Sequence, residues 1–138
     1  MPVYKYRSIE DMNRAQELSR SRLHPNGLRV IDQSLINDVV RTIAERFHPL
    51  RIVLFGSQAT GEAGPDSDLD LMVEMETDLK PVDRAIAIAS LFGDRLWPLD
   101  VVVFTPAEVA RDLRRVGSLV HMIETAGRTV YEHPRETA

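Results

Sequence analysis

Cysteine is absent from this sequence of 138 residues. Its absence excludes disulfide bonds, thiolate nucleophiles and cysteine-based zinc sites, and it agrees with a cytosolic location. An excess of basic residues is missing too, because the formal net charge is −4. A protein that binds nucleic acid or membrane surfaces through a broad positive field is therefore not expected. If the chain handles a polyanionic substrate, metal ions must help to neutralise it.

Long apolar segments are also lacking. The opening stretch MPVYKYRSIEDMNR has no apolar run of the kind found in signal peptides, and no stretch approaches the roughly 18 apolar residues of a membrane span. We therefore expect a cytoplasmic protein that does not bind membranes. Apolar residues are nevertheless plentiful, at 43% of the chain, which is enough for the core of one domain.

Hydrophobic periodicity from residue 32 onward predicts alternating helices and strands. The clearest helix begins near Asp32 or Ser34, repeats apolar residues at spacings of three and four, and is closed by Pro49. Further helices are predicted over 58–62, from Pro81 up to Gly93, and over 106–115 and 119–126. Strands are predicted over 50–55, 68–74, 99–104 and 129–131. This order places the chain in the α/β (α+β) class.

The stretch His24-Pro25-Asn26-Gly27 is a strong helix breaker. Before it, Ser8-Ile9-Glu10-Asp11 has the form of a helix start, and a polar helix is predicted to run from there to about Leu23. We expect three parts: a helical extension over 1–31, a single domain over 32–132, and a flexible tail over 133–138.

The turn Gly56-Ser57 directly follows a predicted buried strand. A glycine at this point lets backbone N–H groups approach a ligand closely, and a helical turn after it would aim its positive end at the same place. Phosphate is the natural ligand for such a turn. The same pair of residues is also ordinary wherever a strand ends, so the turn alone leaves both interpretations open.

Two acids, Asp68 and Asp70, open the next predicted strand, ten residues after the turn. Alternate side chains of a strand share a face, so these carboxylates point the same way from Cα atoms about 6.6 Å apart. Leu69, Leu71 and Val73 then point into the core. An acid pair of this kind is also common on the solvent face of an edge strand.

A third acid, Asp100, begins the apolar run DVVVF, which could lie beside the strand of Asp68 and Asp70. Three carboxylates on adjacent strands repel one another unless a divalent cation neutralises them, and ligands made only of oxygen suit Mg²⁺ or Mn²⁺. Two such ions about 3.5–4 Å apart can hold the attacking and leaving oxygens of a phosphoryl displacement.

This order of strand, Gly-Ser, ten residues, Asp-x-Asp and a third Asp on a later strand resembles the nucleotidyltransferase superfamily with the DNA polymerase β type of catalytic fold. The nearest resemblance is to its minimal nucleotidyltransferase (MNT) branch, over roughly residues 35–132. The resemblance implies a small mixed sheet flanked by helices. It also implies that Gly56 and Ser57 hold the nucleotide phosphates, that Asp68 and Asp70 bind metal ions, and that Asp100 is the third metal-binding carboxylate or the base.

The resemblance further implies an activity and a partner. MNT proteins are commonly the antitoxins of HEPN-type ribonuclease toxins, and some transfer AMP from ATP to a tyrosine of the toxin. We therefore expect ATP as substrate, Mg²⁺ as cofactor (two ions, with Mn²⁺ as a substitute), a HEPN-type toxin as partner, and no direct contact with nucleic acid. Two alternatives stay open: an antitoxin that acts by binding alone, and a small-molecule adenylyltransferase of the aminoglycoside type.

Several other residues carry weaker expectations. The four histidines are scattered without metal-ligand spacing, so we assign them surface or packing roles. Trp97, before Pro98, is expected in the core or at an interface. Arg51 and Arg95 are candidate supports for the nucleotide. A small basic cluster on the 106–115 helix is either solvated or in contact with an acidic partner, and it consists of Arg111, Arg114 and Arg115.

Overall fold

A computed structural model describes residues 31–64, 67–93 and 95–133 of the chain. The predicted helical extension over 1–31 and the predicted tail over 133–138 lie outside these ranges except for Ile31 and His133. Within the described ranges no helix is both long and apolar enough to cross a bilayer.

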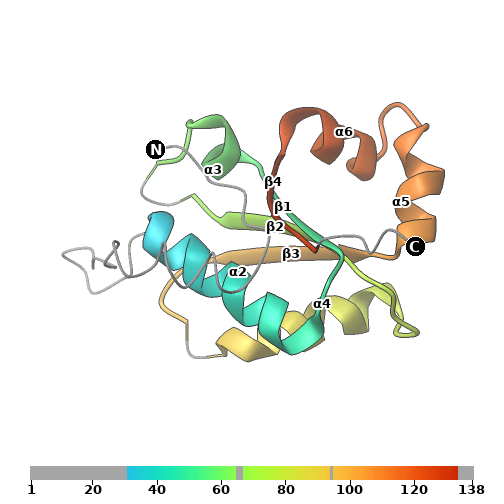
Figure 1. Ribbon diagram of the computed structural model, residues 1–138. Coiled ribbons are helices and arrows are strands. Elements are labelled where there is room, and N and C mark those ends of the chain that lie inside the picture. Colours follow the sequence, from blue (N-terminus) through green and yellow to red (C-terminus); the bar gives the residue numbers. More distant parts are fainter. Residues whose placement is uncertain (1–30, 65–66, 94, 134–138) are drawn as a thin grey trace.

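A four-stranded mixed sheet forms the centre of the molecule (Figure 1). Its strands are β1 (Arg51–Phe55), β2 (Leu69–Glu74), β3 (Leu99–Phe104) and β4 (Arg128–Glu132). They lie in the order β3-β2-β1-β4. Strand β1 runs antiparallel to both of its neighbours, whereas β2 and β3 are parallel. The expected small mixed sheet is confirmed, and β2 begins one residue later than expected, so that Asp68 lies immediately before it.

Helices cover both faces of this sheet (Figure 1). Helices α2 (Gln33–Phe47) and α4 (Pro81–Ala89) lie on one face, and α5 (Pro106–Leu113) and α6 (Leu119–Ala126) lie on the other. The larger core is on the α2 face, where Ile43 of α2 and Leu54 and Leu71 of the sheet are fully buried. A smaller core on the α6 face includes Met72 and Ile123. Strand β2 is therefore packed on both faces.

The helix boundaries follow local capping chemistry. Asp32 accepts a hydrogen bond from Leu35 N at 3.0 Å and starts α2, and His48 ends it in the left-handed conformation. A capping box starts α5, because Thr105 and Glu108 exchange side-chain-to-backbone hydrogen bonds of 2.8 and 3.2 Å. Three helices differ in extent from the prediction. Helix α4 ends at Ala89 and continues as the 3₁₀ helix η1 (Ser90–Phe92), α5 ends at Leu113, and α3 spans Ser57–Thr60.

Arg84 joins three elements whose connection was not predicted from the sequence. Its side chain is buried, and it donates to the carbonyls of Leu79 at 2.7 Å and Val103 at 3.3 Å and to Oε1 of Glu108 at 2.6 Å. Because Val103 belongs to β3 and Glu108 to α5, this guanidinium fixes α4 against the edge strand and the helix after it. These three hydrogen-bond acceptors offset the cost of removing the charged guanidinium from water.

Gly127 lies where α6 turns into β4. A Cβ atom at this position would lie 2.6 Å from the carbonyl oxygen of Ile123 and 2.8 Å from Cγ1 of Val53. Glycine is therefore required at this position by close packing of α6 on β1.

Replacing Gly127 with Ala should lower the free energy of unfolding by about 1–3 kcal/mol, because the added methyl group overpacks this junction. Urea titration would measure the change. Gly93→Ala is the matched control, since its Cβ would meet only the Ser90 carbonyl oxygen at 3.8 Å, an ordinary contact. Equal stability of the two variants would contradict the packing described for Gly127.

Replacing Glu108 with Gln should lower the free energy of unfolding by about 1 kcal/mol at pH 7, since a charged partner of Arg84 becomes neutral while the capping geometry is kept. The hydrogen bond from Thr105 N–H, together with Arg84, holds the pKa of Glu108 below its ordinary value of 4.5. A lowered pKa stabilises the fold above the ordinary pKa, and this stabilisation is lost as the pH falls through the folded value.

The difference between wild type and Glu108→Gln should therefore shrink in acid, as measured by urea titration across pH. Glu62→Gln, at an exposed position, should match wild type at every pH. A difference for Glu108→Gln that persists unchanged in acid would contradict the role given to its charge.

Candidate active site

Gly56 adopts a backbone conformation that favours glycine, with φ 71° and ψ −157°, at the end of β1. The next residue, Ser57, starts α3, so the helical turn begins one residue earlier than expected. A Cβ on Gly56 would collide with Oδ2 of Asp70 and lie 3.1 Å from its Cγ. The Asp70 carboxylate therefore lies directly against the backbone of the Gly-Ser turn.

The strand register brings the three predicted acids to one end of the sheet. Asp70 is paired with Phe55 of β1 on one side and with Asp100 of β3 on the other. Paired residues of neighbouring strands are about 4.8 Å apart and point to the same face. Asp68 lies two residues before Asp70, immediately ahead of the strand. Asp68 and Asp100 are exposed, whereas Asp70 is half-buried.

The opposite face of β2 is packed as predicted. Leu69, Leu71 and Val73 are each 0% exposed and belong to the larger core. Such burial on the α2 face fixes which way the alternating residues of β2 point. The side chains of Asp70 and of Asp100, its register partner, therefore point to the face of the sheet that α5 and α6 cover farther along the strand.

The acids influence one another electrostatically. Burial raises the pKa of Asp70, and repulsion by Asp100 and then by Asp68 raises it further. Carboxylate oxygens are the donors that Mg²⁺ and Mn²⁺ prefer, so the residues fit a divalent cation in chemistry and in their shared face. Within the described ranges, no three His, Cys, Asp or Glu side chains already converge closely enough to hold a metal ion.

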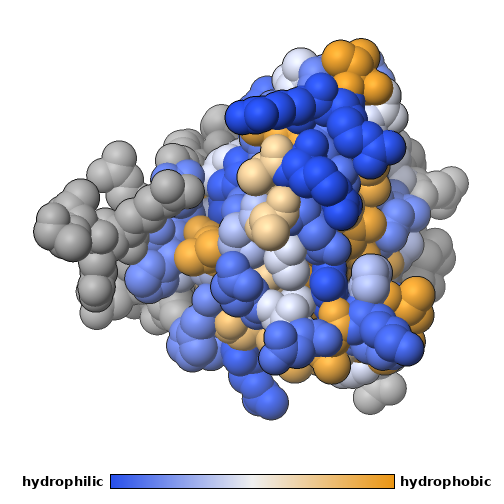
Figure 2. Space-filling model, turned by 90° about the vertical axis from the view of Figure 1, so that its right-hand side faces the viewer, coloured by the Kyte–Doolittle hydropathy of each residue, from blue (hydrophilic) through white to orange (hydrophobic). Residues whose placement is uncertain are grey.

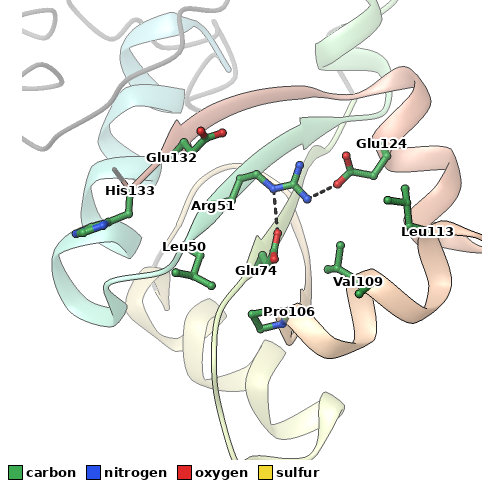
Figure 3. A pocket seen from close by; sticks show the side chains of 10 residues that line it. Leu50, Arg51, Glu74, Pro106, Val109, Leu113, Glu124, Glu132 and His133 are labelled. Atoms are coloured by element: carbon green, nitrogen blue, oxygen red, sulfur yellow. Dashed lines mark hydrogen bonds and ion pairs between the residues drawn. The ribbon is translucent and has the colours of Figure 1, made fainter. Parts of the chain in front are cut away.

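Arg51, considered above as a support for the nucleotide, lies at the other end of β1. It is four residues from Phe55, or about 13 Å along the strand. Its Nε donates to Oε1 of Glu74 at 3.0 Å, and its Nη2 pairs with Glu124 (Figure 3). Burial opposes the charge of Arg51, but Glu124 and Glu74 outweigh it and raise the pKa of the guanidinium. That expectation for Arg51 is wrong, because these glutamates hold the side chain away from the turn.

A pocket of about 470 Å³ surrounds this ion-pair network. Its walls include the apolar side chains of Leu50, Val109 and Leu113, which come from the start of β1 and from α5 (Figure 3). Its place at the far end of β1 separates it from the acid cluster.

Arg95 and Trp97 precede β3 and border a second pocket, of about 550 Å³. Trp97 is buried in the larger core and its ring centroid lies 5.7 Å from that of Phe92, so its predicted packing role is confirmed. The carbonyl of Pro98 accepts a hydrogen bond from Leu69 N at 3.0 Å, which ties this loop to the start of β2. Arg95 therefore lies toward the same end of the sheet as Asp100.

The contact between Gly56 and Asp70 was not predicted, although the sequence holds a signal for it. A glycine placed where a strand ends suggests that something occupies the position of its side chain. Only the antiparallel register of β1 and β2 identifies Asp70 as the group that does so.

Comparison with known proteins shows the family to which the chain belongs. A family model described as a nucleotidyltransferase domain matches residues 36–124, which is more than half of the chain. The chain therefore belongs to the nucleotidyltransferase domain family. Among solved structures, a "putative nucleotidyltransferase" from Sulfolobus solfataricus is similar, with 21% identity over 75% of this chain and 78% of that chain and a TM-score of 0.46. No curated protein matches the chain.

Family membership supports a transferase that moves a nucleotidyl group, and domains of this family typically use nucleoside triphosphates and divalent metals. The fold is the mixed α/β arrangement expected for it, with a small mixed sheet flanked by helices.

Gly56→Ala should destabilise the protein more than Gly61→Ala. Both glycines have positive φ, 71° and 81°, so both variants carry backbone strain of about 1–3 kcal/mol, and the strain is larger at Gly56 because its ψ of −157° gives a conformation that is essentially restricted to glycine. Only the methyl group on Gly56 meets Asp70, because nothing lies within 4 Å of a Cβ on Gly61. Urea titration of the two variants would measure the difference.

The contact between Gly56 and Asp70 also predicts that substitutions at these two positions do not have independent effects on stability. Adding Asp70→Ala to Gly56→Ala should recover part of the lost stability, because the space taken by the carboxylate is then free. Adding Asp70→Ala to Gly61→Ala should recover none. Additive effects in both pairs would show that Asp70 does not occupy the Cβ position of Gly56.

Proposed function

We propose that this protein transfers AMP from ATP to a hydroxyl group, that of a tyrosine, on a HEPN-type ribonuclease toxin and thereby acts as its antitoxin. The general reaction class is supported by the match to the nucleotidyltransferase domain family. The observation that carries the proposal is the pairing of Asp70 with Asp100 across β2 and β3 while Asp70 also lies against Gly56. Phosphate-binding backbone and acids are thereby next to each other.

In this proposal the acceptor hydroxyl oxygen attacks the α-phosphorus of ATP in line. A bond forms between that oxygen and the α-phosphorus, the bond from the α-phosphorus to the β-phosphate oxygen breaks, and pyrophosphate leaves. Asp100, which is exposed, accepts the hydroxyl proton as general base. Backbone N–H groups at Gly56 and Ser57 orient the phosphates. Asp68, Asp70 and Asp100 would hold Mg²⁺, which when bound supplies positive charge to the phosphate oxygens.

A protein acceptor is supported by the openness of the site. Asp68 and Asp100 are both exposed, so a large acceptor can present a hydroxyl group at the sheet edge without entering a closed cavity. The order of the Gly-Ser turn, the Asp-x-Asp pair and the third acid resembles MNT proteins, and this resemblance is the reason for proposing a toxin as the acceptor.

The second candidate is an antitoxin that neutralises its toxin by binding alone. Exposed apolar residues at the junction of α5 and α6, among them Val116 at 87% exposure, favour a binding role. Against it stands the repulsion among three acids, which costs stability and serves no purpose in a pure binder. A small-molecule adenylyltransferase would give no labelled protein in the experiment below.

Asp68→Asn and Asp70→Asn should each reduce transfer of AMP to the toxin at least 100-fold, because removing a carboxylate removes charge needed to hold the metal and phosphates. Intact-mass spectrometry of the toxin after incubation with ATP and Mg²⁺ measures this as loss of the AMP increment. Asp83→Asn, an exposed acid in the first turn of α4, is the matched control and should keep full activity.

Folding of the variants is checked by urea titration. Asp70→Asn should be at least as stable as wild type, because the repulsion from Asp68 and Asp100 disappears. Full labelling by both Asn variants would refute the catalytic assignment. Protection of cells from the toxin by variants that no longer label it would favour the binding-only antitoxin.

A further inference from the structure

The end of α5, the turn after it and the start of α6 form a protruding surface, here called the α5–α6 tip. Its apolar members recur every three residues and are all exposed: Leu113 (43%), Val116 (87%), Leu119 (41%) and Met122 (45%). Figure 2 shows an apolar group at the top of this side of the molecule, bordered by hydrophilic residues. Large apolar side chains gathered on a surface typically mark an interaction site.

A basic rim surrounds these apolar residues. It contains three exposed arginines, Arg111, Arg114 and Arg115, and one aspartate, Asp112. Arg111 binds both oxygens of Asp112, at 2.8 and 3.1 Å, and Arg115 binds Oδ1 at 3.3 Å. Within the described part of the chain, Arg114 has no acidic partner. The tip is thus locally positive in a chain whose formal net charge is −4.

The tip is held in one conformation by its own hydrogen bonds. Ser118 donates from Oγ to the carbonyl of Asp112 at 2.8 Å, and the same oxygen accepts from His121 N at 3.0 Å to start α6. Gly117, which directly precedes Ser118, has a positive φ of 93°, which a residue with a side chain rarely adopts. A surface ordered before binding loses less conformational entropy when a partner docks.

The outer face of α4 offers a comparison. Val82 (70% exposed) and Ile86 (57%) are also apolar and exposed, one turn apart. Charges beside them have both signs, with Lys80 and Asp83 in the same turn, so this face selects no partner by charge. The α5–α6 tip differs because positive charges outnumber negative charges in its basic rim.

We propose that the α5–α6 tip is the docking surface for an acidic, apolar segment of the acceptor protein, an inference that rests on the function proposed above. Apolar contact with Val116 and its neighbours supplies affinity, and Arg114 attracts and orients the acidic residues. The tip belongs to helices that cover the same sheet face as Asp70 and Asp100 (Figure 1). The tip is at the end of this face where α5 follows β3, opposite the end that carries Asp70 and Asp100, so a partner seated there must extend along the face to reach the acids.

Binding of the wild-type chain and its variants to the acceptor of the proposed function, a purified HEPN-type toxin, tests the proposal by isothermal titration. The double variant Arg114→Glu/Val116→Asp should raise Kd at least 30-fold. Arg114→Ala alone should weaken the dependence of Kd on salt, whereas Val116→Ser should raise Kd and leave that dependence unchanged. The matched control, Lys80→Glu/Val82→Asp on α4, should bind within threefold of wild type.

Each other outcome overturns the proposal. A double tip variant that binds like wild type, or an α4 variant that loses binding instead, places the partner elsewhere while leaving AMP transfer intact. A wild-type chain that neither binds nor labels the toxin removes the proposed function as well. A wild-type chain that dimerises in sedimentation experiments, with the dimer lost in Val116→Asp, assigns the tip to a second copy.

Discussion

Parallel pairing of β2 with β3 is the constraint on which the rest of the structure depends. It places Asp100 beside Asp70, and a slip of one residue would send Asp100 to the opposite face of the sheet. Parallel neighbours require a crossover connection, which here includes α4. Arg84 fixes that helix to the Val103 carbonyl and to Glu108. A buried cation far from the acids thus helps to hold their register.

Charge is distributed unevenly along the central strands. At one end Arg51 is matched by Glu74 and Glu124, and at the other Asp70 faces Asp100 and Asp68 with no cation beside it among the described residues. The matched end and the two apolar cores stabilise the sheet, so the unmatched end can keep an unfavourable arrangement. Functional sites typically keep locally unfavourable arrangements whose cost in stability is offset elsewhere in the structure.

Sequence periodicity was sufficient for the parts of the fold that depend on neighbouring residues. The alternation in β2 correctly predicted that Leu69 and Leu71 are buried, and the helix predicted from residue 106 begins there. Contacts between residues far apart in the sequence could not be predicted in this way. Nothing near Arg51 in the sequence indicates Glu124, which lies 73 residues away and makes the arginine structural. The acids were predicted from their spacing, but the contact of Asp70 with Gly56 depends on a register that only the assembled sheet defines.

The carboxylate of Asp70 occupies the space that any side chain at residue 56 would need. These two positions are therefore not free to diverge independently as the sequence evolves. A descendant that lost the acid would also lose one of the two reasons for the glycine, and only the backbone conformation would still favour it. Among related chains, a residue other than glycine at this position is therefore expected mainly where the acid at position 70 has already been replaced.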